Sequence, residues 1–173
     1  MTLSLDDVYV ASCLQMLEGL QSLVDKAQAH CEEHGIDPAE ILQARLAEDM
    51  WPFAKQVTEA THHSARAVPT LHKGVFTPEL DPVPESFALL KADLAESIAR
   101  LRAVPAGSLD AIADQDMRFE FRDFRLDFTV RDFLLSFSLP NFYFHVTTAY
   151  AILRGRGLPV GKMNYLGPLR LKA

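Results

Sequence analysis

The sequence predicts a mainly helical protein built as a bundle of four long helices, with a small β-hairpin before the last of them. Four segments carry apolar residues at three- and four-residue steps, the period of a helix with one buried face. One short segment alternates apolar and charged residues instead, as a two-stranded hairpin does. The chain has 173 residues, the size of one domain, and we expect residues 1–173 to form a single helical bundle domain.

The first helix is expected over residues 5–34 and should end at Gly35. A shorter helix should follow over residues 39–45, because Asp37 can cap it and Pro38 suits its first position. The apolar positions that repeat along the first helix are Val10, Leu14, Leu17, Leu20, Val24, Ala27 and Cys31.

Two further helices flank a long proline-bearing connection. The second long helix is expected from residue 51 to residue 71, and the third over residues 85–104. The connection between them, residues 72–84, can span roughly 40 Å when extended, which is enough to cross a bundle from end to end. The two middle helices can therefore run parallel to each other.

The hairpin is expected within residues 117–129, where phenylalanines alternate with charged residues around a turn at Arg122 and Asp123. That turn lacks the glycine that tight hairpin turns favour. The fourth helix should run over residues 129–155, because a threonine at its start and an aspartate three residues later are spaced as a cap.

Composition argues against two kinds of partner. The chain has 17 basic and 23 acidic residues and a formal net charge of −6, so we expect it to bind no nucleic acid. Residues 133–153 lack charged side chains, which raises the question of a membrane span. They include Asn141, His145 and several hydroxyl side chains as well as Pro140, so we expect no span and no membrane partner.

The compartment is predicted from the chain's start and its cysteines. The first seven residues lack the basic and apolar run of a secretory signal, which predicts a cytoplasmic protein. Cys13 and Cys31 lie in the same predicted helix, about 27 Å apart by the rise of a helix, so they should remain reduced.

Asn141 and His145 are the first candidates for a functional site. They lie one helical turn apart, so both side chains should point to the same, inward face of the fourth helix. Pro140, just before them, removes a backbone hydrogen bond to the carbonyl of Ser136 and predicts a kink. The pair can frame a buried pocket, or it can be a core histidine and asparagine that satisfy each other and nearby backbone groups.

Asp49 and Trp51 precede the second helix and are the next candidates. Trp51 offers an aromatic wall with one N–H donor. Asp49 can be a ligand or a general base, but an aspartate in this place is more often a helix cap, or an ion-pair partner of Arg45. We therefore expect any small-molecule pocket to be lined by these two residues together with Asn141 and His145.

His62 and His63 are adjacent, so on a helix their side chains diverge by about 100° and cannot both bind one ion. Only His63 should face inward. No HExxH or CxxC pattern accompanies them, and histidines on a helix flank are common, so we expect neither to bind a metal.

The family resemblance rests on three strings: ARLAEDMWPFAKQV at residues 44–57, FLLSFSLPNFYFHVTTAYAILR at 133–154 and GLPVGKMNYLG at 157–167. With them the sequence resembles, over nearly its whole length, the bacterial family called domain of unknown function 1993. That family lies within the DinB/YfiT-like superfamily of four-helix bundles. The resemblance implies an up-down-down-up bundle, and it favours a homodimer.

Many members of that superfamily hold a divalent metal through three histidines, one on the second helix and two spaced HxxxH on the fourth. Here that pattern is broken, because Asn141 occupies the first position of the fourth-helix pair and no histidine stands near Trp51. We therefore expect no cofactor. The alternative is a divalent metal held by His145 with Asp49 and Asn141.

Three functions are compatible with these observations. The first is an uncharacterised DinB-like bundle with a pocket for an unknown small molecule. The second is a divalent-metal-dependent transferase or hydrolase that acts on a thiol or another small molecule. The third is a dimeric interaction module without enzyme activity, which uses the apolar outer side of the fourth helix. We expect that surface to comprise Leu135, Phe142, Val146 and Leu153.

Overall fold

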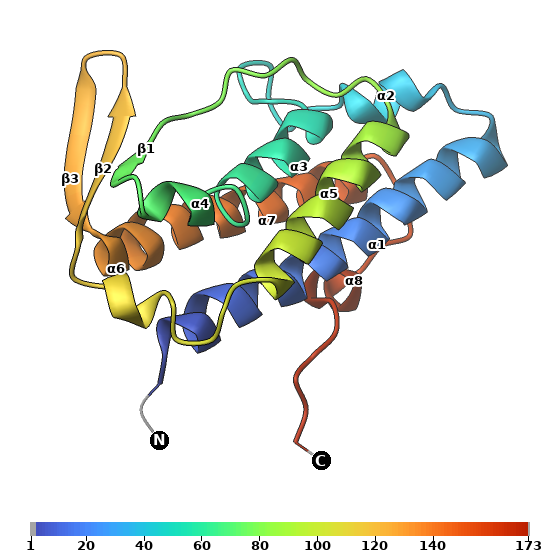
Figure 1. Ribbon diagram of the computed structural model, residues 1–173. Helices are drawn as coiled ribbons and strands as arrows, with labels where there is room; N and C mark the ends of the chain where they lie inside the picture. The colour runs from blue at the N-terminus through green and yellow to red at the C-terminus, as the bar shows by residue number, and fades with distance from the viewer. Residues whose placement is uncertain (1–2, 173) are drawn as a thin grey trace.

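The computed structural model describes residues 3–172, which form a four-helix bundle with a small sheet at one end (Figure 1). The long helices are α1 (Ala11–His34), α3 (Phe53–His62), α5 (Phe87–Arg102) and α7 (Leu139–Gly155). The short helices are α2 (Pro38–Leu42), α4 (Val68–Leu71), α6 (Val130–Asp132) and α8 (Lys162–Leu166). The strands are β1 (Val75–Phe76), β2 (Asp116–Phe121) and β3 (Phe124–Thr129).

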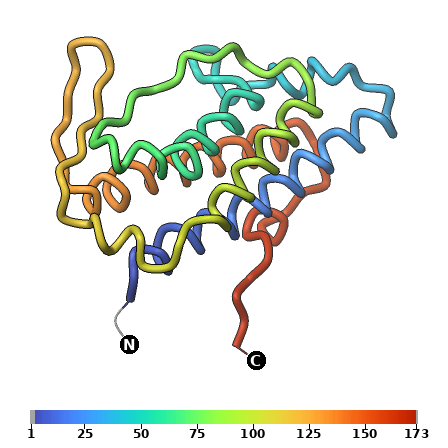
Figure 2. Tube along the Cα trace, in the orientation of Figure 1, coloured from blue at the N-terminus to red at the C-terminus, as the bar shows by residue number. Residues whose placement is uncertain are grey.

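The long helices pack in the predicted up-down-down-up order. α1 lies mainly on α5, and α3 lies mainly on α7. The proline-bearing segment returns along the length of the bundle, so α3 and α5 run parallel, while α1 and α7 run the opposite way (Figures 1 and 2). Buried apolar side chains from all four helices form one core cluster.

The helix starts follow the capping chemistry that the sequence predicts. The side chain of Asp37 accepts a hydrogen bond from the N–H of Ala39 at 2.9 Å and caps α2. The side chain of Thr129 accepts from the N–H of Asp132 at 3.1 Å and caps α6. A π-helical stretch, Phe133–Ser138, joins α6 to α7, so the predicted distortion near Pro140 takes the form of a widened turn just before it.

The prediction of one continuous second helix over residues 51–71 is wrong, because the structure has an interruption between α3 and α4. The interruption begins at His63. The carbonyl groups of His63 and Ser64 accept hydrogen bonds from the hydroxyl of Tyr9, at 3.0 and 3.2 Å. In a continuous helix these carbonyls would accept from backbone N–H groups of the next turn. A tertiary contact from the segment before α1 thus ends α3 at the position where His63 enters the core.

The hairpin prediction is confirmed, and the structure adds a strand that the sequence does not predict. β2 and β3 pair antiparallel around a two-residue turn, where Arg122 adopts a positive φ of 55°. β1 pairs in parallel with β2 and completes a sheet in the order β1-β2-β3. Phe119 and Phe128 on one face of the sheet pack against Phe137 at the start of the fourth helix.

The prediction of an apolar outer surface on the fourth helix is wrong. Phe142, Val146 and Leu153 are fully buried, and only Leu135 is partly exposed, at 36%. α7 contacts α3, α1 and α8, so neighbouring elements cover its apolar side chains on most sides. Three of the four residues expected to face a partner are therefore core residues.

Within residues 3–172, no helix combines the length and the apolar character that crossing a membrane requires. Cys13 and Cys31 are both buried and free, as predicted from their spacing.

Candidate metal centre

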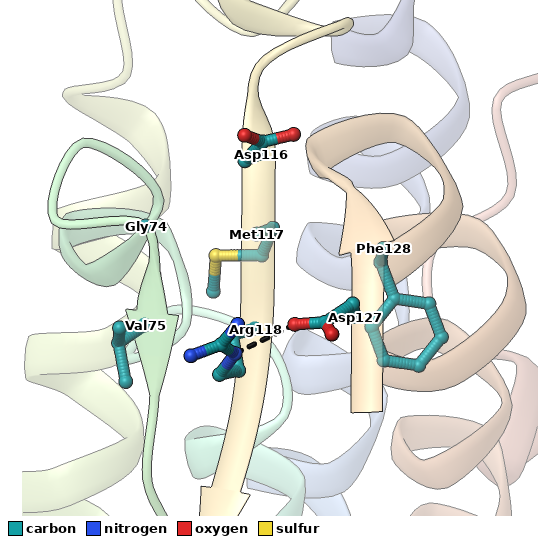
Figure 3. Close-up of a pocket in the computed structure, with 7 residues that line it drawn as sticks. All are labelled: Gly74, Val75, Asp116, Met117, Arg118, Asp127 and Phe128. Atoms are coloured by element: carbon teal, nitrogen blue, oxygen red, sulfur yellow. Dashed lines mark hydrogen bonds and ion pairs between the residues drawn. The ribbon is translucent and has the colours of Figure 1, made fainter. Parts of the chain in front are cut away.

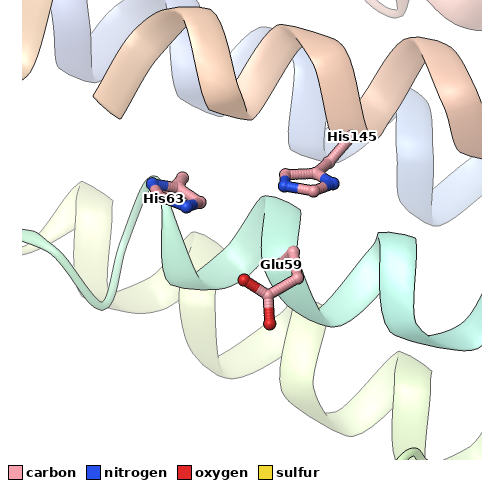
Figure 4. Close-up of side chains that lie close together, drawn as sticks. All are labelled: Glu59, His63 and His145. Atoms are coloured by element: carbon pink, nitrogen blue, oxygen red, sulfur yellow. The ribbon is translucent and has the colours of Figure 1, made fainter. Parts of the chain in front are cut away.

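Three buried side chains with metal-binding donor atoms meet between α3 and α7. Glu59 and His63 lie four residues apart at the end of α3, so they share one face of that helix, and His145 faces them from α7 (Figure 4). One donor atom from each of the three lies within 4.8 Å of the others. Their exposed fractions are 4%, 8% and 5%, so the cluster is shielded from bulk water.

Backbone contacts hold His63 in place where α3 ends. The hydroxyls of Tyr9 and Ser138 donate hydrogen bonds to the carbonyl oxygen of His63, at 3.0 and 2.8 Å. Both hydroxyl groups are buried and also lie 3.0 Å from each other. The residue is thus clamped from the segment before α1 and from the start of α7, which fixes the position from which its ring projects.

Hydrogen bonding assigns the tautomer of His145. The carbonyl of Trp51 can only accept, so the side-chain amide of Gln56 donates to it, at 3.1 Å. The amide oxygen of Gln56 then faces Nδ1 of His145 at 2.7 Å, and this nitrogen must be the donor. The other ring nitrogen, Nε2, consequently carries a free lone pair, which is the form of imidazole that binds a metal.

The ring of His63 has a buried nitrogen that nothing satisfies. Its Nδ1 has no hydrogen-bond partner within the described chain. The ring stacks on that of His145, with centroids 5.8 Å apart and planes 17° from parallel. Because buried polar groups normally have partners, an unpaired nitrogen on a ring of this cluster is the kind of group that a bound cation satisfies.

Glu59 is fixed by contacts with Lys55 and His62. Nζ of Lys55 lies 2.8 Å from one carboxylate oxygen, and Nδ1 of His62 lies 3.6 Å from the other. Burial alone would raise the pKa of Glu59, but the contacts with His62 and Lys55 outweigh it and lower the pKa to about 2. The carboxyl group is therefore ionised at neutral pH, as a metal ligand must be.

Both histidine rings of the cluster are neutral at neutral pH. Burial is the main cause that lowers the pKa of His63 to about 3 and that of His145 to about 4. Two neutral imidazoles and one carboxylate suit zinc, iron, cobalt or nickel. The residues present therefore fit a divalent transition metal.

Only some of the residues predicted for the site lie together. Asp49, Trp51 and His145 line a shallow hollow of about 200 Å³, which Met50, Gln56 and Phe144 complete. The indole of Trp51 stacks on the His145 ring at 5.8 Å, on one side of that ring, and is half exposed.

Asn141 and Asp49 do not take the roles that the sequence suggests for them. The side-chain amide of Asn141 donates to the carbonyl of Phe137 at 2.7 Å, within the same helical segment, so it does not pair with His145. Asp49 is exposed, and α3 begins without a side-chain cap. Arg45 donates to the carbonyl of Met50 at 2.7 Å, and no ion pair with Asp49 forms among the described residues.

The adjacent histidines His62 and His63 do not predict the cluster, because only His63 belongs to it. The divergence of His62 and His63 argues against a shared ion. The informative spacing is Glu59 to His63, an ExxxH pattern that places a carboxylate and an imidazole on one helix face. The partners expected for His145 are Asp49 and Asn141, whereas the structure brings Glu59 and His63 to it.

The fold defines a DinB-like four-helix bundle. It is similar to the crystal structure of a DinB family member protein from Shewanella denitrificans, with a TM-score of 0.81 and 30% sequence identity. The similarity covers 98% of this chain and 95% of that chain. The chain belongs to the family called domain of unknown function 1993, DUF1993, which matches residues 5–166. No curated protein matches the chain.

Proposed function

We propose that Glu59, His63 and His145 bind a divalent transition-metal ion, and that this DinB-like protein acts on a small molecule at that metal. One observation carries the proposal: three buried donors lie within 4.8 Å of one another, and Nδ1 of His63 lacks any other partner within the described chain. We thus favour the alternative of a bound divalent metal over the absence of a cofactor, with Glu59 and His63 rather than Asp49 and Asn141 beside His145.

The number of donors favours a reactive metal over a structural one. Structural zinc sites are usually closed by four protein ligands, whereas catalytic sites have three and keep a position open. A metal with an open position supplies Lewis-acid activation of a bound water, thiol or carbonyl group. A metal-dependent transferase or hydrolase is therefore favoured over a metal-free pocket. Of the three donors only His145 lines the hollow beside Trp51, and we propose that a small molecule approaches the metal from that side.

Metal content tests this proposal. Untagged protein is loaded with zinc, freed of excess metal and analysed by elemental mass spectrometry. We expect close to stoichiometric zinc in the wild type and in His72→Ala, which changes an exposed histidine outside the cluster. His63→Ala and His145→Ala should each lose most of it. Metal-free wild type, or full retention in both cluster variants, would overturn the proposal.

Gln56 should control metal affinity without touching the metal. Gln56→Leu removes the acceptor that fixes Nδ1–H of His145, and we expect metal to bind about 10–100-fold more weakly. Gln56→Glu keeps an acceptor in the same place and should retain most of the affinity. Competition with a chromogenic chelator measures both values. Equal affinity in Gln56→Leu and wild type would show that the hydrogen bond does not position the ligand.

A further inference from the structure

The outer edge of β3 is open. The sheet order is β1-β2-β3, so β2 is central and no strand among residues 3–172 covers the other side of β3. β3 has six residues and contains no proline. An open strand edge presents unpaired N–H and C=O groups, which are a template for another strand.

The hydrogen-bond pattern shows which groups face that edge. Arg118 of β2 stands opposite Asp127 of β3, but its N–H points the other way and donates to the carbonyl of Gly74 at 2.9 Å. Bonded and non-bonded pairs alternate along antiparallel strands. The pair of Arg118 and Asp127 is therefore non-bonded, and so is the pair of Glu120 and Arg125, two residues along.

A second contact confirms this phase. The N–H of Val130 donates to the carbonyl of Gln115 at 2.9 Å, which is the bonded pair expected three positions beyond Arg118 and Asp127. The backbone N–H and C=O groups of Asp127 and Arg125 consequently point away from β2, to the open edge. Figure 3 shows β2 between β1 and β3, with the side chains of Arg118 and Asp127 paired across the two strands.

The sequence of β3 is complementary to itself. When two copies of the strand pair antiparallel around Leu126, Arg125 of one copy stands opposite Asp127 of the other. Phe124 stands opposite Phe128 in the same register. Opposite charges and aromatic pairs are the side-chain combinations that stabilise neighbouring antiparallel strands.

We propose that two copies of this protein associate through β3, antiparallel and centred on Leu126, to form one continuous six-stranded sheet. Arg125 and Asp127 of the two copies then exchange both backbone hydrogen bonds, because these are the residues whose groups face the open edge. The proposed contact does not involve the metal site. The edge of β3, and not the buried residues of α7, is the contact surface between the two copies.

Acidic and basic side chains on the polar face of the sheet would continue to alternate across such a junction. Within one copy, Arg118 pairs with Asp127 at 2.6 Å, and Arg125 pairs with Glu120 at 3.3 Å. Across the junction, Asp127 of one copy meets Arg125 of the other, so acidic and basic side chains alternate from β2 to β2. The exposed ring of Phe124, at 57%, gains a partner in Phe128 of the second copy.

Aromatic side chains anchor the hairpin on the bundle. Phe128 packs against Phe133 and Phe137, and Phe119 packs against Phe76 and Phe137, so the apolar face of the sheet is anchored on the bundle. Because two short strands bury little surface, the dimer should dissociate in the micromolar range.

Two charge reversals test the register by sedimentation velocity over a micromolar concentration series. Arg125→Glu should be monomeric, because the introduced carboxylate would face Asp127 of the second copy. Asp127→Lys should be monomeric as well, because the introduced ammonium group would face Arg125. An equimolar mixture of the two variants should dimerise, since each reversed charge then meets its opposite. Asp116→Lys, a matched reversal on the central strand, should dimerise like the wild type.

Hydrogen exchange of the wild type keeps the test independent of whether the variants fold. The amides of Arg125 and Asp127 should exchange fast in dilute protein and become protected at concentrations where dimer forms. Either a monomeric wild type throughout the series or dimeric single variants would overturn the proposal. So would a mixture that stays monomeric while circular dichroism shows both variants folded.

Discussion

A charge placed at Phe142 is expected to unfold the protein. Phe142→Glu puts a carboxylate into a fully buried position on α7, within the apolar core cluster. We expect the free energy of unfolding to fall by at least about 4 kcal/mol, because an unpaired charge must lose its hydration there. Thermal unfolding followed by circular dichroism measures the loss.

The matched control is two residues away on the same helix. Phe144 is 54% exposed, so Phe144→Glu should change the free energy of unfolding by no more than about 0.5 kcal/mol. If Phe142→Glu melts like the wild type and instead splits a dimer, then α7 presents Phe142 to a partner, contrary to its burial in the core.

Removal of Glu59 is expected to have the second large effect, on stability as well as on metal binding. Glu59→Ala leaves Lys55 without its carboxylate partner, although both side chains are almost completely buried. We expect the metal-free protein to lose about 3–5 kcal/mol of unfolding free energy, the usual cost of an uncompensated buried charge. Denaturant unfolding in the presence of a chelator measures this loss without a contribution from metal.

An exposed ion pair of the same spacing provides the control. Glu96 and Arg100 lie four residues apart on α5, and their charged groups are 2.7 Å apart, but Glu96 is exposed and Arg100 is partly exposed. Glu96→Ala should therefore cost no more than about 0.5 kcal/mol. Equal losses in Glu59→Ala and Glu96→Ala would mean that the Lys55 to Glu59 pair is not isolated from water.

The sequence predicts the bundle well where local chemistry decides the outcome. α5 follows from a clean apolar stripe, and the caps at Asp37 and Thr129 follow from side chains that bond to nearby backbone N–H groups. The interruption after α3 cannot be predicted in this way. It depends on Tyr9 and Ser138, which are remote in sequence and donate to the carbonyl of His63.

The burial of the fourth helix and the presence of β1 also depend on contacts between segments that are remote in sequence. α7 is covered on most sides, so its apolar period does not distinguish an outer face from an inner one, and the sequence pattern places Phe142 and Val146 on the wrong side. β1 has only two residues, and its strand character arises from pairing with β2.

The candidate site is predictable only in part. The sequence identifies His145 correctly as an inward-facing polar residue, because helical spacing decides which face it shares. Its partners cannot be identified in the same way, since they depend on how α3 and α7 are set against each other. The spacing of Glu59 and His63 is visible in the sequence, but only their burial opposite His145 makes that spacing informative.

Anomalous diffraction from zinc-loaded crystals tests the metal centre most directly. We expect one strong peak between α3 and α7, within about 2.0–2.2 Å of a carboxylate oxygen of Glu59, a ring nitrogen of His63 and Nε2 of His145. Nδ1 of His145 should remain bonded to Gln56. Zinc bound elsewhere, with Nδ1 of His63 still unpaired and the cluster unchanged, would contradict the proposed metal centre.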